Sequence, residues 1–237
     1  MKKNKKLLSV SITSTSYFDI KKTIDIINKS DADRIHFDVM DGVFVPNITY
    51  GMDFISSVKP YSQKFFDVHL MIINPLPYIK SFFASGSDLI SVHIEAKNCL
   101  KSLKLIKSLG IKSGVVINPK TSYKKILKYL DFVDEILIMS VEPGFGGQKF
   151  IEKVADKVLK ISSLVKKKGK NILVQVDGGI NFETAKKVFE NGANSVVVGS
   201  FLFKQKDFND TVFKIKNMYR HILWTCTISS PTTGIRL

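Results

Sequence analysis

Eight short apolar runs rich in Val and Ile recur along the chain, separated by longer stretches in which apolar residues return every three or four positions. The runs are 7–13, 34–39, 65–71, 89–94, 113–118, 135–139, 172–176 and 195–199. The stretches of helical period are 18–29, 52–58, 76–84, 99–109, 123–130, 151–167, 182–190 and 208–218. Apolar runs without clean alternation are typical of parallel strands buried on both faces. Eight such strands, each followed by a helix, predict an α/β protein with a closed (β/α)8 TIM barrel.

Glycines mark the expected turns between helices and strands. Gly86, Gly110, Gly169 and Gly192 fall at or just after helical stretches and shortly before the next apolar run. A helix that ends in a left-handed turn favours glycine at that point. A doubly wound open sheet has the same alternation with about six strands, so the number eight favours the barrel.

The length and composition are those of a globular protein. The chain has 237 residues, 44% of them hydrophobic and 24% charged, and barrels of about 200–250 residues form one domain. We expect a single catalytic barrel over residues 1–220 and a C-terminal appendage over 221–237 without a catalytic role. No apolar run approaches the roughly 18 residues of a membrane-spanning helix. Two cysteines and the lack of a secretory signal predict a cytoplasmic protein.

The net charge of +15 raises the question of a nucleic-acid partner. Only three basic residues are arginines, and the lysines occur as scattered pairs and short runs along the helical stretches. We interpret them as solvated helix faces that attract a small anionic substrate. We therefore expect neither a nucleic-acid nor a membrane partner. A basic nucleic-acid-binding protein remains a remote alternative, which salt-dependent binding would reveal.

Polar side chains stand at the ends of three predicted strands, where the chemistry of such barrels is located. His36 and Asp38 share one face of the second strand because side chains alternate with period two. His69 ends the third strand and Asp177 ends the seventh. Two imidazoles and two carboxylates that converge in this way suit a divalent transition metal.

Other polar residues near these strand ends leave alternatives open. His93 and Glu95, at the end of the fourth strand, form a competing pair of ligands. Asp67 lies two residues deeper than His69, a position that suits a residue orienting a ligand better than a ligand itself.

Glycine clusters follow three adjacent strands. The first is the loop 140–149 after the sixth strand, which contains Gly144, Gly146 and Gly147. Gly178 and Gly179 follow the seventh strand, and Gly199 with Ser200 follows the eighth. Backbone N–H groups in such loops can approach an anion closely, and phosphate sites in barrels are often built there. The clusters together predict a phosphate-binding site.

The segments 36–47, 67–71, 139–150, 176–179 and 199–200, spread in order over most of the barrel, resemble the ribulose-phosphate 3-epimerase family. The resemblance implies a metal-dependent isomerase of the pentose phosphate pathway that converts D-ribulose 5-phosphate to D-xylulose 5-phosphate. It implies one divalent metal ion, Zn, Fe, Mn or Co, and we expect a homo-oligomer.

The resemblance also assigns roles to individual residues. The metal ligands that it implies are His36, Asp38, His69 and Asp177. The substrate-binding residues that it implies are Ser11, His69, Gly144, Phe145, Gly146, Gly147, Gly178, Gly179, Gly199 and Ser200. The methionines that it places over the metal centre are Met40, Met71 and Met139.

The expected mechanism removes the proton at carbon 3, beside the ketone, to give a 2,3-enediolate that the metal stabilises. By the resemblance, Asp38 accepts this proton and Asp177 returns one from the opposite face. We predict that one carboxyl is protonated at rest and the other is ionised. The alternatives are an epimerase of D-allulose 6-phosphate and a metal-free aldolase or decarboxylase, which would need a lysine at a strand end.

Two departures from the family pattern affect the site. The first loop has Val10 and Ser16 where the family usually has Pro and Asp. Gln175 stands where we expect Glu, on the same face as Asp177. The loss of this charge should favour the ionised form of neighbouring carboxyls and weaken metal retention.

Overall fold

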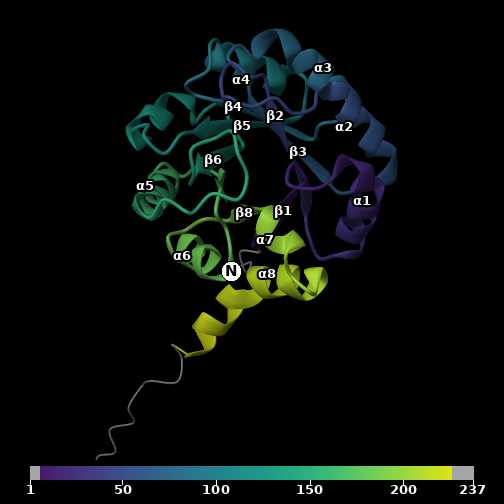
Figure 1. Ribbon diagram of the computed structural model, residues 1–237. Coiled ribbons are helices and arrows are strands. Elements are labelled where there is room, and N and C mark those ends of the chain that lie inside the picture. The colour runs from purple at the N-terminus through teal and green to yellow at the C-terminus, as the bar shows by residue number, and fades with distance from the viewer. Residues whose placement is uncertain (1–5, 226–237) are drawn as a thin grey trace, which may run out of the picture.

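The structure, a computed structural model, describes residues 6–225; residues 1–5 and 226–237 lie outside the described part. Eight parallel strands pair in chain order, and β8 pairs with β1, so the sheet is a closed barrel (Figure 1). The predicted TIM barrel is confirmed. The strands are β1 (Leu7–Ser11), β2 (Arg34–Met40), β3 (Phe65–Met71), β4 (Leu89–His93), β5 (Lys112–Ile117), β6 (Glu135–Met139), β7 (Leu173–Asp177) and β8 (Ser195–Val198).

Helices cover the outside of the barrel (Figure 1). The α-helices are α1 (Ile20–Lys29), α2 (Met52–Val58), α3 (Ile79–Ala84), α4 (Cys99–Ser108), α5 (Lys153–Lys167), α6 (Phe182–Glu190), α7 (Ser200–Phe203) and α8 (Phe208–Thr225). The 3₁₀ helices are η1 (Tyr17–Asp19), η2 (Lys59–Tyr61), η3 (Leu76–Tyr78) and η4 (Tyr123–Tyr129). The short helix α7 is not predicted by the sequence pattern.

The connection between β5 and β6 is a 3₁₀ helix, η4, where the periodicity predicts a helical stretch over 123–130. Its buried side chains explain the geometry. Ile126 and Tyr129 are buried and Tyr123 is half-buried, so the residues facing the barrel recur every three positions. A repeat of three places such side chains directly above one another in a 3₁₀ helix, whereas an α-helix would rotate them apart.

Helix α8 continues beyond the predicted end of the barrel at residue 220. It runs to Thr225, and its last part, drawn in yellow, extends away from the ring of helices (Figure 1). The rest of the predicted appendage, 226–237, lies outside the described residues. The absence of a catalytic role for 221–237 stays a prediction.

The two faces of the sheet differ in what they bury. On β2, Ile35, Phe37 and Val39 pack in the apolar core between barrel and helices. The Phe37 ring lies 4.8 Å from that of Phe66 on β3, and both are fully buried. Each such side chain stabilises the fold by about 1.5–3 kcal/mol through removal from water. The residues between them on β2 face the barrel interior and are polar, which places the chemistry inside the barrel.

The predicted glycine turns are present. Gly86, Gly110, Gly169 and Gly192 have φ of +92°, +80°, +62° and +97°. These left-handed conformations reverse the chain at the N-terminal end of the barrel, opposite the end where catalytic residues gather.

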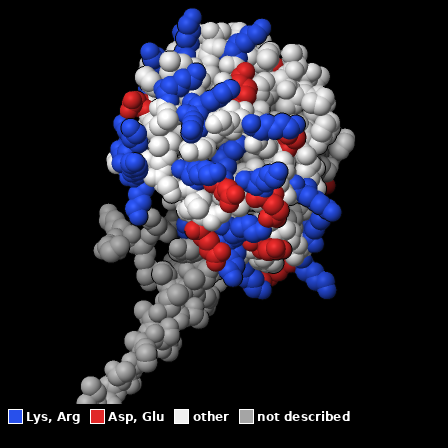
Figure 2. Space-filling view, turned by 90° about the vertical axis from the view of Figure 1, so that its left-hand side faces the viewer, with Lys and Arg blue, Asp and Glu red and all other residues white. Residues whose placement is uncertain are grey.

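Lysines and arginines are spread over the face of the molecule shown in Figure 2, with acidic residues among them. Several form ion pairs, such as Lys21 with Asp25 at 2.8 Å and Lys214 with Asp210 at 2.6 Å. This distribution agrees with the interpretation of solvated helix faces. Among residues 6–225, the structure shows no helix with the length and apolar character needed to cross a membrane.

Candidate active site and metal centre

Strand register brings the predicted ligands together at the C-terminal end of the barrel. Asp38 pairs with His69 across β2 and β3, and Asp177 on β7 pairs with Met139 on β6. His36, Asp38, His69 and Asp177 each offer one ligand atom, and these atoms all lie within 4.8 Å of one another. We call these four residues the ligand group. The sequence predicted this set, and the structure brings all of its members together.

Asp38 is the most heavily contacted member of the ligand group. Its Oδ1 lies 3.3 Å from His36 Nε2 and 3.2 Å from His69 Nδ1. Its Oδ2 accepts hydrogen bonds from Ser11 Oγ at 2.8 Å and Thr13 Oγ1 at 3.0 Å. Although burial opposes ionisation, the His36 imidazole and hydrogen bonds from both histidines hold the pKa of Asp38 well below its usual range.

The pKa of Asp177 is shifted in the opposite direction to that of Asp38. Burial, together with the negative charge of Asp38, raises its pKa to about 7, although the backbone N–H of Gly178 counteracts this. The assignment of one ionised and one protonated carboxyl at rest stays a prediction.

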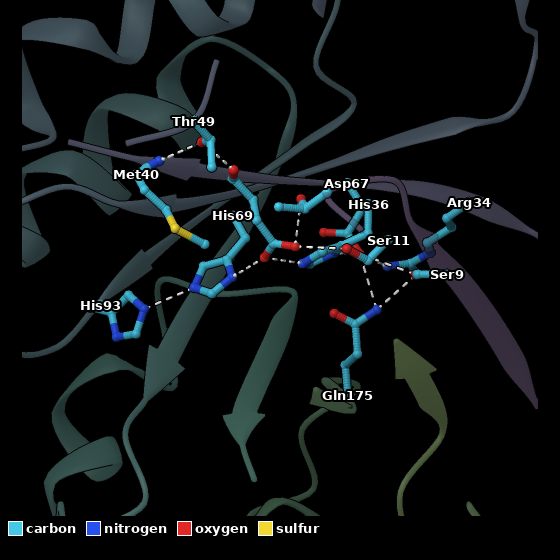
Figure 3. Close-up of polar contacts among 12 residues, drawn as sticks. Ser9, Ser11, Arg34, His36, Met40, Thr49, Asp67, His69, His93 and Gln175 are labelled. Atoms are coloured by element: carbon cyan, nitrogen blue, oxygen red, sulfur yellow. Dashed lines mark hydrogen bonds and ion pairs between the residues drawn. The ribbon is translucent and has the colours of Figure 1, made fainter. Parts of the chain in front are cut away.

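A second polar cluster lies deeper in the barrel, and we call Ser9, Arg34, Asp67, Glu135 and Gln175 the base network. Arg34 donates to Glu135 at 2.6 Å and lies 3.9 Å from Asp67. Gln175 Nε2 donates to Asp67 Oδ2 at 3.0 Å and to Ser9 Oγ at 2.9 Å (Figure 3). Burial raises the pKa of Glu135 to about 7, despite the Arg34 charge.

Asp67 links the base network to the ligand group. Its Oδ2 lies 3.0 Å from His36 Nδ1, so it orients that ring as its position in the sequence suggests. Burial opposes ionisation, yet His36, Arg34 and the Gln175 hydrogen bond lower the pKa of Asp67 to about 2. The amide at position 175 thus favours the ionised form of a neighbouring carboxyl, in the direction expected. Its effect on metal retention stays a prediction.

The competing pair, His93 and Glu95, lies outside the ligand group. His93 Nε2 is 2.8 Å from His69 Nε2, on the side of that ring away from Asp38 (Figure 3). Burial lowers the pKa of His93 to about 4, so this imidazole is neutral at neutral pH.

A cavity of about 230 Å³ opens beside Asp38 and Asp177. His36 and His69 are fully buried and do not line it, so the structure offers no direct support for His69 as a substrate contact. The other predicted substrate and methionine residues line the cavity: Ser11, Met40, Met71, Met139, Gly144, Phe145, Gly146, Gly147, Gly178, Gly179, Gly199 and Ser200.

The cavity also has lining residues that the sequence did not single out: Thr13, Ser14, Gln148, Asn181 and Lys204. Thr13 and Ser14 follow β1 directly, and the rule that strand-end loops carry the chemistry could have found them. Lys204 follows the unpredicted helix α7, so no signal in the sequence placed it at the site.

The glycine loops approach one another too closely for side chains. A Cβ at Gly179, where φ is +62°, would lie 2.5 Å from the backbone nitrogen of Phe150. A Cβ at Gly146 would lie 2.8 Å from Ser14 Oγ. The loops after β1, β6 and β7 therefore meet at one edge of the cavity and leave room for a small anion beside their backbone groups.

The ligand group fits a divalent metal on its own chemistry. Its nitrogen and oxygen donors converge in a buried site, and ionised or uncharged polar groups are costly there unless they are paired or bound to a cation. Imidazole with carboxylate suits Zn²⁺, Fe²⁺, Mn²⁺ and Co²⁺ alike.

Comparisons with known proteins agree with the site. The model of the ribulose-phosphate 3 epimerase family matches residues 7–203. A ribulose-phosphate 3-epimerase of Bacillus subtilis is 44% identical over 208 residues, which cover 87% of this chain and 96% of that protein. The chloroplastic ribulose-5-phosphate-3-epimerase of Arabidopsis thaliana is 41% identical over 213 residues, covering 89% of this chain and 76% of that protein.

A solved structure of 3-hexulose-6-phosphate synthase from Salmonella typhimurium superposes with a TM-score of 0.66 at 17% identity, covering 91% of this chain and 99% of that one. At this identity the likeness shows the shared barrel fold. The extent and identity of the sequence matches carry the family assignment, and the expected isomerase family is confirmed. The chain belongs to the ribulose-phosphate 3-epimerase family.

Proposed function

We propose that this protein converts D-ribulose 5-phosphate to D-xylulose 5-phosphate by inverting carbon 3. The observation that carries the proposal is the placement of Asp38 and Asp177, from the separate strands β2 and β7, within one ligand group beside a glycine-lined cavity. The names of the relatives give the reaction, and the residues in this chain supply the groups that it needs.

The ligand group is the proposed holder of one divalent ion, Zn, Fe, Mn or Co. When bound, such an ion acts as a Lewis acid that stabilises negative charge on the oxygens at carbons 2 and 3. Asp67 contributes by holding the His36 ring through its Nδ1 at 3.0 Å.

Asp38 is the proposed proton acceptor. It takes the proton from carbon 3, and the electrons of the broken C–H bond move to the carbonyl oxygen at carbon 2 to form a 2,3-enediolate. The hydroxyls of Ser11 and Thr13 fix Asp38 Oδ2, at 2.8 and 3.0 Å, which leaves Oδ1 toward the imidazoles. A fixed carboxylate needs little reorganisation when the proton is transferred.

Asp177 is the proposed proton donor on the opposite face of the sugar. It returns a proton to carbon 3 as the carbonyl at carbon 2 re-forms, which inverts that centre. The reverse reaction exchanges the roles of the two carboxyls. Met40, Met71 and Met139 line the cavity next to them and exclude water from the intermediate.

The phosphate of the substrate is proposed to bind at the glycine loops. Gly144 to Gly147, Gly178, Gly179, Gly199 and Ser200 line this part of the cavity. Lys204 lines it as well and adds a positive charge. Backbone N–H groups that a side chain would otherwise block can then reach the phosphate oxygens.

The proposal is tested with purified protein treated with a chelator and then supplied with each candidate metal in turn. We expect epimerisation of D-ribulose 5-phosphate to stop on chelation and to return with at least one divalent ion. In D₂O, the product should carry deuterium at carbon 3. A parallel assay with D-allulose 6-phosphate distinguishes the six-carbon reaction. Turnover that is insensitive to chelation would contradict the metal centre, and faster turnover of the hexulose would contradict the substrate assignment.

We further propose a cytoplasmic homo-oligomer without a nucleic-acid partner. The spread of lysines and their pairing with acidic residues support the last point. Gel filtration with light scattering tests the assembly, and titration with DNA or RNA at low salt tests the partner. Tight, steeply salt-dependent binding would contradict it.

A further inference from the structure

The end of β4 carries a buried contact that the proposed mechanism does not use. His93 is fully buried, and its Nε2 lies 2.8 Å from Nε2 of His69 (Figure 3). At this distance one nitrogen must carry the hydrogen and the other must accept it, because two lone pairs or two N–H groups would repel each other. The pair therefore has a defined donor and a defined acceptor.

The position of His69 decides which nitrogen donates. Its Nδ1 faces the ligand group, 3.2 Å from Asp38 Oδ1, while its Nε2 faces His93. Without a metal, the hydrogen bond to Asp38 needs a hydrogen on His69 Nδ1. A nitrogen that binds a metal must have a free lone pair, so in the metal-bound protein the hydrogen of His69 belongs on Nε2. His93 Nε2 is then the acceptor, and His93 carries its own hydrogen on Nδ1.

Glu95 stands where this second hydrogen points. Its Oε2 lies 3.4 Å from His93 Nδ1, and its Oε1 accepts hydrogen bonds from Thr121 Oγ1 at 2.5 Å and from the backbone N–H of Asn118 at 3.2 Å. The carboxylate is thus fixed from the loop after β5, and it favours the N–H form of His93 at Nδ1.

The loop that holds Glu95 is itself fixed by one half-buried lysine. Lys157 Nζ on α5 donates to the carbonyl oxygens of Asn118, Pro119 and Thr121 at 2.9, 2.6 and 2.8 Å. On the other side, the Phe44 ring packs 4.6 Å from the His93 ring. The imidazole of His93 is therefore held in position from several elements and not by one contact alone.

We propose that His93 and Glu95 are positioning residues that fix the tautomer and ring plane of His69, so that its Nδ1 is presented to the metal. This inference rests on the proposed metal centre. Partners that orient a metal-binding histidine typically account for about 10–100-fold in metal affinity. The affinity of the ligand group should therefore depend on two residues that do not touch the metal or the substrate.

The test is titration of the chelator-treated full-length protein with Co²⁺ or Zn²⁺ alone, in competition with an indicator of known affinity. His93→Leu removes the acceptor and should weaken metal binding about 10–100-fold. His93→Gln keeps an acceptor oxygen and should restore most of the loss. Glu95→Gln should have an intermediate effect. Val116→Ala is the matched control, because Val116 pairs with His93 across β4 and β5 but has no polar group; its metal affinity should equal that of the parent.

A second measurement reads the tautomer directly. Long-range ¹H–¹⁵N spectra of Zn²⁺-loaded protein with labelled histidine should show His69 protonated at Nε2 in the parent. Equal metal affinity in the parent, His93→Leu and His93→Gln, or His69 protonated at Nδ1, would overturn this inference and leave the metal centre standing. A parent protein that binds neither ion would overturn the metal centre and the inference together. If His93→Leu does not fold, His93→Gln and Glu95→Gln against Val116→Ala still decide the question.

Discussion

The barrel interior contains two polar clusters, one above the other, that differ in how their charges are satisfied. In the base network the partners are other side chains, such as Arg34 with Glu135 at 2.6 Å. In the ligand group the donors converge on a shared point beside a cavity. The charges of the base network are largely satisfied within it, although Asp67 Oδ1, Glu135 Oε1 and Gln175 Oε1 have no hydrogen-bond partner. The converging donors of the ligand group need a cation. We therefore propose that one cluster maintains the fold and the other performs the chemistry, although both are buried.

The largest expected effect is on the ligand group. Asp177→Asn removes a carboxylate that is both a proposed metal ligand and the proposed proton donor, and kcat should fall by about 10³-fold or more. The free energy of unfolding should not decrease, because the buried carboxyl with a raised pKa is replaced by a neutral amide. Assays of kcat and urea unfolding check both expectations, with Asp156→Asn on the exposed face of α5 as the control. Full activity in Asp177→Asn would end the proposed pair of carboxyls.

The base network should respond in the opposite way. Arg34→Leu leaves Glu135 buried without its cation and should lower the free energy of unfolding by about 3–5 kcal/mol. The double variant Arg34→Met with Glu135→Leu should recover most of this loss, because neither charge remains. Urea unfolding measures the change. A kcat loss in folded Arg34→Leu as large as that of Asp177→Asn would erase the contrast between the clusters.

The pH dependence of stability sharpens the comparison further. The pKa of Glu135 is about 7 in the folded protein against 4.5 for the free side chain. The folded state therefore binds this proton more tightly, and the resulting stability is complete below pH 4.5 and is lost as the pH rises to about 7. Glu135→Gln should flatten this decline by up to about 3 kcal/mol.

Urea unfolding at several pH values between 4.5 and 7 makes the measurement. Chelator-treated protein is used throughout, so that Asp177 contributes the same background to both proteins. An identical slope in the parent and Glu135→Gln would show that Glu135 keeps its ordinary pKa.

The smallest expected effect is at the border of the ligand group. Thr13→Val removes one of the two hydroxyls on Asp38 Oδ2, and a hydrogen bond to a charged group contributes about 1.5–3 kcal/mol. We expect kcat to fall about tenfold, with little change in KM, and Thr13→Ser to restore it. Steady-state kinetics at saturating metal checks this. A loss that Thr13→Ser does not restore would point to the lost methyl group instead of the hydroxyl.

Much of the fold and of the ligand group could be predicted because the signals are local. Period-two alternation alone places His36 with Asp38 on one face, and the barrel brings β2, β3 and β7 to the same end. The base network could not be predicted in this way. Arg34 and Glu135 are 101 residues apart, and their contact depends on strands that are not neighbours in the sheet.

The remaining differences have similar causes. The helical period at 123–130 does not separate an α-helix from the 3₁₀ helix η4, because the choice depends on which side chains the barrel buries. Likewise His93 resembled a rival ligand in the sequence, since alternation cannot tell which side of His69 it approaches.

The contact at Gly179 limits how this enzyme family member can change. A carbon added at Gly179, in the loop after β7, would lie 2.5 Å from the backbone nitrogen of Phe150, in the loop after β6. The two loops are therefore in direct main-chain contact at this point. Other cavity-lining side chains can be exchanged without touching this contact, but a side chain at position 179 would meet main-chain atoms that cannot turn away. A change of shape at this point therefore requires the main chain of both loops to move together.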